Sequence, residues 1–212
     1  MYRLFLTAAL ALGLSAMSAL PPFEGAAFAQ DAAAAQTYLQ ARQSAFQRIM
    51  SRPVRGEAAI AARRTQLTAA LAELLDYTEL ARRALGEHDA AATPAQRAEF
   101  TSLLRQLVER SYQKSLESTI DYEIRYVGSS NEASAVTIRT IAKSRTNGRA
   151  PEVSIDYAVH QVNGAWRVYD VATDGVSLVR TYRSQFHRIV ARDGVDALLV
   201  KMRERLANEG EI

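Results

Sequence analysis

Apolar and polar residues alternate strictly over one stretch in the C-terminal half of the chain. Its apolar positions are Val153, Ile155, Tyr157 and Val159. This period of two is typical of a strand with one buried face. Asn163-Gly164 then predicts a two-residue type I′ turn, because both central positions of that turn need positive φ. Trp166 to Tyr169 returns as the partner strand, Asp174-Gly175 ends the extended run, and a helix is expected from about Val176.

Before this hairpin, apolar residues recur at the spacing of helices. The pattern predicts one helix over Asp31 to Ser51 and a second from Glu57, with Ile60, Leu67 and Leu71 on its buried face. Asp76 can cap a short third helix that Gly86 ends. Thr93-Pro94-Ala95-Gln96 combines an N-cap Thr, a Pro at the first helical position and a Gln at N3. It opens a long helix that should run to about Ser118.

The period changes to two after the long helix. Tyr122, Ile124 and Tyr126 predict a strand ended by Gly128 to Asn131, and Val136, Ile138 and Thr140 predict the next. After the hairpin, helical spacing resumes, with a break at Asp193-Gly194. Helices, then strands, then helices without βαβ alternation indicate an α+β fold. We expect one domain over residues 30–212, an antiparallel sheet of about four strands packed against several helices.

The N-terminus has the pattern of a secretory signal peptide. Arg3 precedes an apolar run from Leu4 to Leu20, and Ala27-Phe28-Ala29 forms an A-x-A site. We therefore expect residues 1–29 to be removed, with cleavage after Ala29. The chain has no cysteine, which excludes thiol nucleophiles and cysteine-ligated metals. The net charge of +3 does not suggest a nucleic-acid partner.

Signals for catalysis are poor. The three histidines, His88, His160 and His187, are far apart in the sequence and have no metal-ligand spacing. Asp156 and His160 share a strand face about 13 Å apart at strand rise, too far for a catalytic dyad. No nucleophile elbow or phosphate-cradling loop occurs. We expect neither an enzyme nor a cofactor or metal site.

What the sequence offers instead is apolar surface on the sheet and on the long helix. The apolar side chains of the sheet and of the long helix either pack together as an ordinary core or enclose an apolar ligand between them. The residue pattern leaves both interpretations open.

Several motifs together resemble the MlaC family, also called toluene-tolerance proteins. They are Thr93-Pro94-Ala95-Gln96-Arg97 with Tyr112, Asn147-Gly148-Arg149-x-Pro151, Trp166-Arg-Val-Tyr169-Asp170, Gly175-Val176-Ser177-Leu178 and Gly194-Val195-Asp196-Ala197-Leu198. They occur in order between about Glu73 and Leu206, and the helix over Asp31 to Ser51 matches only in character.

This resemblance implies a periplasmic carrier of an ABC-type lipid transport system, with acyl chains in an apolar cavity between sheet and helices. The residues that would line it are Phe100, Leu104, Leu107, Tyr112, Ile138, Ile155, Tyr157, Val159, Trp166 and Val168. Arg149 would lie near the headgroup or at a docking surface, or it is a solvated loop residue.

The resemblance also implies partners: a membrane-anchored MCE-domain protein of the inner-membrane transporter and an outer-membrane lipoprotein complex. The expected ligand is a phospholipid, and a hopanoid is the alternative within the same fold. Two alternatives belong to other functional classes. The first is a periplasmic interaction module with a filled core and no ligand, and the second is a lipid-processing hydrolase.

Overall fold

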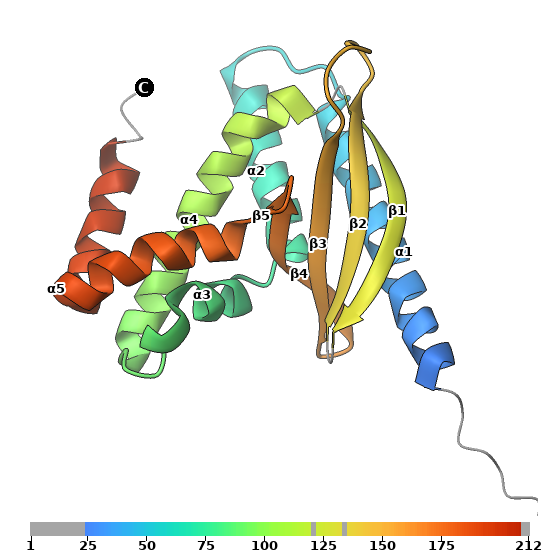
Figure 1. Ribbon diagram of the computed structural model, residues 1–212. Helices are drawn as coiled ribbons and strands as arrows, with labels where there is room; N and C mark the ends of the chain where they lie inside the picture. The colour runs from blue at the N-terminus through green and yellow to red at the C-terminus, as the bar shows by residue number, and fades with distance from the viewer. Residues whose placement is uncertain (1–23, 120–121, 133–134, 209–212) are drawn as a thin grey trace, which may run out of the picture.

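The computed structural model describes residues 24–119, 122–132 and 135–208, in which helices are followed by a sheet and a last helix (Figure 1). The elements are α1 (Glu24–Met50), α2 (Glu57–Leu74), α3 (Tyr77–Leu85), the 3₁₀ turn η1 (Gly86–His88), α4 (Pro94–Thr119), β1 (Tyr122–Glu132), β2 (Ala135–Ser144), β3 (Val153–Val162), β4 (Ala165–Thr173), β5 (Val176–Ser177) and α5 (Leu178–Asn208). This order confirms the predicted α+β class.

The sheet is antiparallel, with its five strands in sequence order. Asn163 and Gly164 have φ of 51° and 77°, which confirms the predicted type I′ hairpin turn. Asp174 and Gly175 have φ of 48° and 78° and turn the chain back in the same way. The prediction that a helix begins near Val176 is therefore wrong by two residues, because this turn first pairs the short β5 with β4.

The predicted end of the first strand is also wrong. β1 continues through Gly128 to Glu132, and a register shift between Tyr126 and Gly128 leaves Val127 without an opposite residue on β2. Such a bulge absorbs one residue and lets pairing resume, and a glycine inside a strand often marks one.

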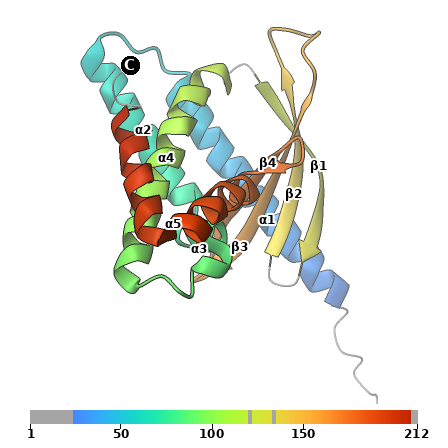
Figure 2. The same ribbon diagram turned by 60° about the vertical axis from the view of Figure 1, so that its left-hand side comes forward.

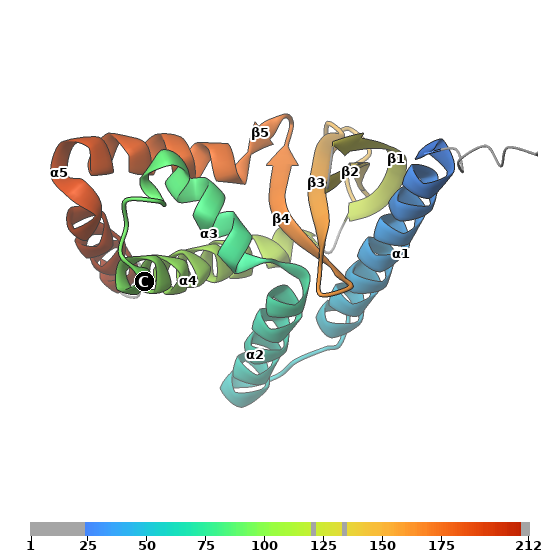
Figure 3. The same cartoon turned by 90° about the horizontal axis from the view of Figure 1, so that it is seen from below.

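The helices form two groups around the sheet. α1 runs diagonally across β1 and β2, whereas α3 and α5 lie beside β4 and pack with α4 (Figures 1 and 2). The N-terminal part of α2 projects beyond the other elements (Figure 3), and this is why Ile60, predicted on a buried face, is 37% exposed. Leu67 and Leu71, further along the same helix, are buried as predicted.

Local capping signals explain where the helices begin. The Asp76 side chain accepts the Glu79 N–H at 3.0 Å, which is the predicted cap of α3. Thr93 and Gln96 bond reciprocally, backbone N–H to side-chain oxygen, at 2.9 and 3.2 Å.

Gly194, with φ 83° and ψ 172°, divides α5 into two helical segments and confirms the predicted break.

None of the helices in the described ranges is long and apolar enough to cross a membrane. The predicted signal peptide, residues 1–29, lies for the most part outside the described residues, and its cleavage after Ala29 stays a prediction.

Candidate functional site

The side of the sheet that faces α1 carries the alternating apolar residues. On β2, every second residue from Val136 to Ser144 is buried on this side, under α1. On β3, the residues opposite them in the ladder are only half-buried along most of the strand: Ile155 lies opposite Thr140, and Tyr157 opposite Ile138. The part of this side that belongs to β3 is therefore less completely covered than the part that belongs to β2.

Three tyrosines meet at this side of the sheet. Tyr126 comes from β1, Tyr157 from β3 and Tyr112 from the C-terminal half of α4. The Tyr112 ring also contacts the Phe46 ring of α1, with centroids 5.8 Å apart. The Tyr126 hydroxyl donates to Gln43 Oε1 of α1 at 3.0 Å. Each tyrosine thus combines a large apolar ring with one polar atom, an arrangement common at ligand sites.

Burial acts on the acidity of all three phenols. Burial raises the pKa of Tyr157 to about 12. It raises the pKa of Tyr126 to about 12 as well, and the neighbouring Tyr157 contributes a smaller effect of the same sign. The pKa of Tyr112 is raised for the same two reasons. These hydroxyls therefore stay neutral in any physiological compartment, so that the region carries no phenolate charge against an apolar ligand.

The residues predicted to line a lipid cavity fall into two groups. Six are buried in the main hydrophobic core: Phe100, Leu104, Leu107, Ile138, Val159 and Val168. The other four are half-buried: Tyr112, Ile155, Tyr157 and Trp166. Among the six buried residues, Phe100 also contacts α5: its ring packs edge-on against the Phe186 ring, with centroids 5.3 Å apart.

Arg149 is exposed in the turn between β2 and β3. Its backbone N–H donates to Asn147 Oδ1 at 3.1 Å, and the Ala150 N–H closes the same turn on the Asn147 carbonyl at 3.0 Å. The turn itself is therefore ordered by Asn147, while the guanidinium stays available at the surface.

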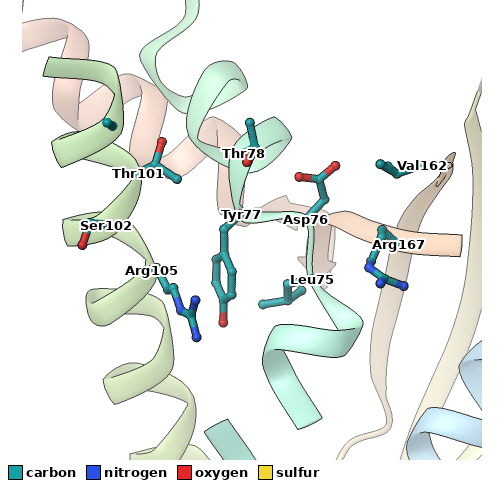
Figure 4. A pocket seen from close by; sticks show the side chains of 10 residues that line it. Leu75, Asp76, Tyr77, Thr78, Thr101, Ser102, Arg105, Val162 and Arg167 are labelled. Carbon is teal, nitrogen blue, oxygen red and sulfur yellow. The ribbon is translucent and has the colours of Figure 1, made fainter. Parts of the chain in front are cut away.

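A pocket of about 450 Å³ opens between the start of α3, the N-terminal half of α4 and the β3–β4 hairpin (Figure 4). Its lining residues are Leu75, Asp76, Tyr77, Thr78, Ala98, Thr101, Ser102, Arg105, Val162 and Arg167. Two arginines and an aspartate give it a charged wall, and none of the predicted cavity residues lines it. Arg105 donates to Glu109 Oε1 at 2.7 Å and lies over the Tyr77 ring, so this cation is already engaged.

Two arrangements of histidines were missed by the sequence analysis. His160 on β3 lies with its Nε2 2.9 Å from Asp76 Oδ2. His88 Nε2 and His187 Nδ1 are 3.0 Å apart, although 99 positions separate these residues in the chain. The first contact depends on the packing of α3 beside the sheet and the second on the packing of η1 against α5, so spacing along the sequence carries no signal for either.

Comparison with known proteins identifies the family. The profile of the MlaC protein family matches residues 40–204. The chain belongs to the MlaC family. All the motifs quoted for that resemblance lie within the matched range, so the recognition from the sequence is confirmed.

Among MlaC relatives, the intermembrane phospholipid transport system binding protein MlaC of Haemophilus influenzae is 25% identical over 138 residues. That match covers 62% of this chain and 64% of the relative, less than two thirds of its length. A phospholipid-binding protein from Ralstonia solanacearum, solved in complex with a phospholipid, is similar in structure with a TM-score of 0.62. It shares 22% identity over 89% of this chain and 98% of its own, a likeness that shows the fold.

Proposed function

We propose that the chain binds a phospholipid whose acyl chains lie against the side of the sheet that faces α1. The observation that supports this most is the row of half-buried side chains on β3, represented by Ile155 and Tyr157, beside the fully buried row on β2. A strand in the middle of a sheet would bury such residues completely in an ordinary filled core. The phospholipid in the relative's structure and the name of the Haemophilus relative support the choice of ligand.

The energetics of acyl chains explain why a carrier would need such a surface. Each buried methylene is worth about 0.8 kcal/mol, so an acyl chain of about 16 carbons represents roughly 13 kcal/mol in water. A lipid that crosses an aqueous compartment must therefore have its chains enclosed. Transfer from a bilayer into the protein exchanges one apolar medium for another and is nearly neutral in this term. The direction of transport then depends on the partners.

We further propose that the carrier works in the periplasm. It would shuttle lipid between a membrane-anchored MCE-domain protein of an inner-membrane ABC-type transporter and an outer-membrane lipoprotein complex. The secretory pattern of residues 1–29 and the family membership support this location. Arg149, exposed on an ordered turn, is the residue we propose for contact with an anionic headgroup or an acidic partner surface.

Native mass spectrometry of the protein purified from its own compartment tests the binding proposal. We expect a complex heavier than the processed chain by the mass of one phospholipid, which solvent extraction then releases for identification. A bound mass equal to that of a hopanoid would support the carrier function but identify a hopanoid, and not a phospholipid, as the ligand. A chain that is free of lipid, and stays so after incubation with phospholipid vesicles, would contradict the proposal and favour an interaction module. The Phe46–Tyr112 contact, which fills space between α1 and α4, is the observation that favours that alternative.

A further inference from the structure

Three side chains with metal-binding atoms meet where η1 lies against α5. Glu87 and His88 belong to η1, and His187 lies in the first half of α5. His187 Nδ1 is 3.0 Å from both His88 Nε2 and Glu87 Oε1, and His88 Nε2 is 3.9 Å from the same carboxylate oxygen. Two imidazole nitrogens and one carboxylate oxygen thus lie at the corners of a small triangle (η1 and α5 adjoin in Figures 1 and 2).

The fold holds in place both elements that carry these ligand atoms, α5 and η1. Phe186, the residue before His187, is anchored in the core by ring contacts with Phe100 and Tyr182, each with centroids 5.3 Å apart. On the other side, Gly86 ends α3 with φ 59° and directs the chain into η1. The Arg97 guanidinium donates to the Asp89 carbonyl at 2.9 Å and fixes the backbone that follows. The three ligand atoms are therefore brought together by elements that pack for independent reasons.

We propose that Glu87, His88 and His187 bind a divalent transition-metal ion of the zinc type. Tetrahedral coordination with bonds of about 2.0–2.1 Å places ligand atoms about 3.3–3.4 Å apart, which lies within the range of the three observed separations. Imidazole nitrogen together with carboxylate oxygen suits zinc, cobalt, nickel or copper, whereas magnesium and calcium prefer oxygen ligands alone. Three protein ligands leave the fourth position to water.

The cluster is open to solvent from the side of Glu87 and His187. The side chains of His88, His187 and Glu87 are 19%, 51% and 62% exposed, so an ion can enter without rearrangement of the core. The Arg183 guanidinium lies close against Gly86, the residue before Glu87. A bound ion would join η1 to α5 and stabilise this corner. The site shares no residue with the proposed lipid-binding surface, so it stands independently of that function.

The test is a zinc titration of the full chain purified with an affinity tag that contains no histidine. We expect one equivalent of Zn²⁺ to bind by calorimetry and to raise the melting temperature, since the ion binds the folded state. Co²⁺ at the same site should show the visible absorption bands of four-coordinate cobalt. His187→Gln should weaken zinc binding by about tenfold or more, because loss even of an outer-shell partner costs about 10–100-fold. His187→Cys, which restores a ligand, should recover part of it.

Two variants serve as matched controls. His160→Gln removes the histidine outside the cluster, and Arg188→Gln changes an exposed neighbour of His187 on α5; both should bind zinc like the parent chain. Because His187 is exposed, its replacement leaves the core unchanged, and circular dichroism checks that each variant is folded. A parent chain that binds no zinc would overturn the proposal. Unchanged zinc affinity in both His187→Gln and His88→Gln would overturn it as well, because the ion would then bind elsewhere.

Discussion

Asp76 and His160 connect the helical part of the molecule to the sheet. His160 Nε2 lies 2.9 Å from Asp76 Oδ2, while Asp76 Oδ1 accepts the Glu79 N–H that begins α3. The Asp76 backbone N–H donates to the Val168 carbonyl of β4 at 2.8 Å, so this one residue contacts two strands and one helix. His160 also packs edge-on against the Tyr169 ring, with centroids 5.0 Å apart. It therefore serves a structural purpose on the side of β3 opposite Tyr157.

Replacement of Asp76 should destabilise the fold. Asp76→Ala removes the cap of α3 and leaves the half-buried His160 without its partner. We expect a loss of about 2 kcal/mol in the free energy of unfolding, measured by urea denaturation. Asp76→Asn keeps an oxygen for the cap and an amide for His160, so its loss should be less than about 1 kcal/mol. Equal losses in the two variants would contradict this explanation, because the oxygen and the amide that Asn keeps would then preserve neither contact.

Local patterns in the sequence were sufficient for most of the secondary structure. The caps at Asp76 and Thr93 and the turn at Asn163-Gly164 each depend on residues within four positions of one another, so the sequence predicts them directly. The errors at Gly128 and Val176 are errors about pairing. A bulge in β1 and a two-residue β5 become favourable only when a neighbouring strand is in place, and a local pattern does not describe that neighbour.

The candidate site was less predictable than the fold, for a related reason. Alternation correctly predicts which side of β3 is apolar, but not how completely a helix covers it. Leu104 and Tyr112 lie on the same helix, yet Leu104 is 1% exposed and belongs to the core, whereas Tyr112 is half-buried near the sheet. A charged residue at position 104 would therefore unfold the chain before it tested any ligand. The histidine pair His88 and His187 depends entirely on tertiary packing.

Gly194 should be difficult to replace. Its φ of 83° and ψ of 172° lie in a region that only glycine adopts readily, whereas a Cβ at this position would meet no other atom within 4 Å. The cost of Gly194→Ala is therefore a backbone cost of about 1–3 kcal/mol, measured by thermal or urea unfolding. Gly148→Ala, at a position with equally open surroundings and no positive φ, should change stability by less than about 0.5 kcal/mol. Similar losses in both variants would contradict this explanation.

Glu79 should make the fold sensitive to acid. Hydrogen bonds and charge interactions with Arg82 and Arg83 lower the pKa of Glu79 from 4.5 to about 2, with the Arg82 hydrogen bond as the largest cause. Because the folded state holds the carboxylate ionised, this stabilisation is present above the unfolded-state pKa and is lost as the pH falls toward about 2. Glu79→Gln should therefore be less stable than the parent near neutral pH, and the difference should shrink between about pH 4.5 and 2.

Urea unfolding of the parent and the variant at several pH values measures this difference. Glu204→Gln, at an exposed position on α5, is the matched control and should show little pH-dependent difference from the parent. A difference between the Glu79 variant and the parent that stays constant across the acid range would contradict the assignment.

Two isoleucines on neighbouring strands separate ligand binding from general stability. Ile155 on β3 lies on the side of the sheet that faces α1, whereas Ile141 on β2 lies on the other side, and both are half-buried. Ile155→Asn would place an amide against the acyl chains of the proposed lipid. Burial of an unpaired amide costs about 1–3 kcal/mol, so lipid occupancy measured by native mass spectrometry should fall by about tenfold. Ile141→Asn should leave occupancy unchanged, with a loss of folding stability of similar size. If both variants keep their lipid, or both lose it equally, the side of the sheet that faces α1 is not the binding surface.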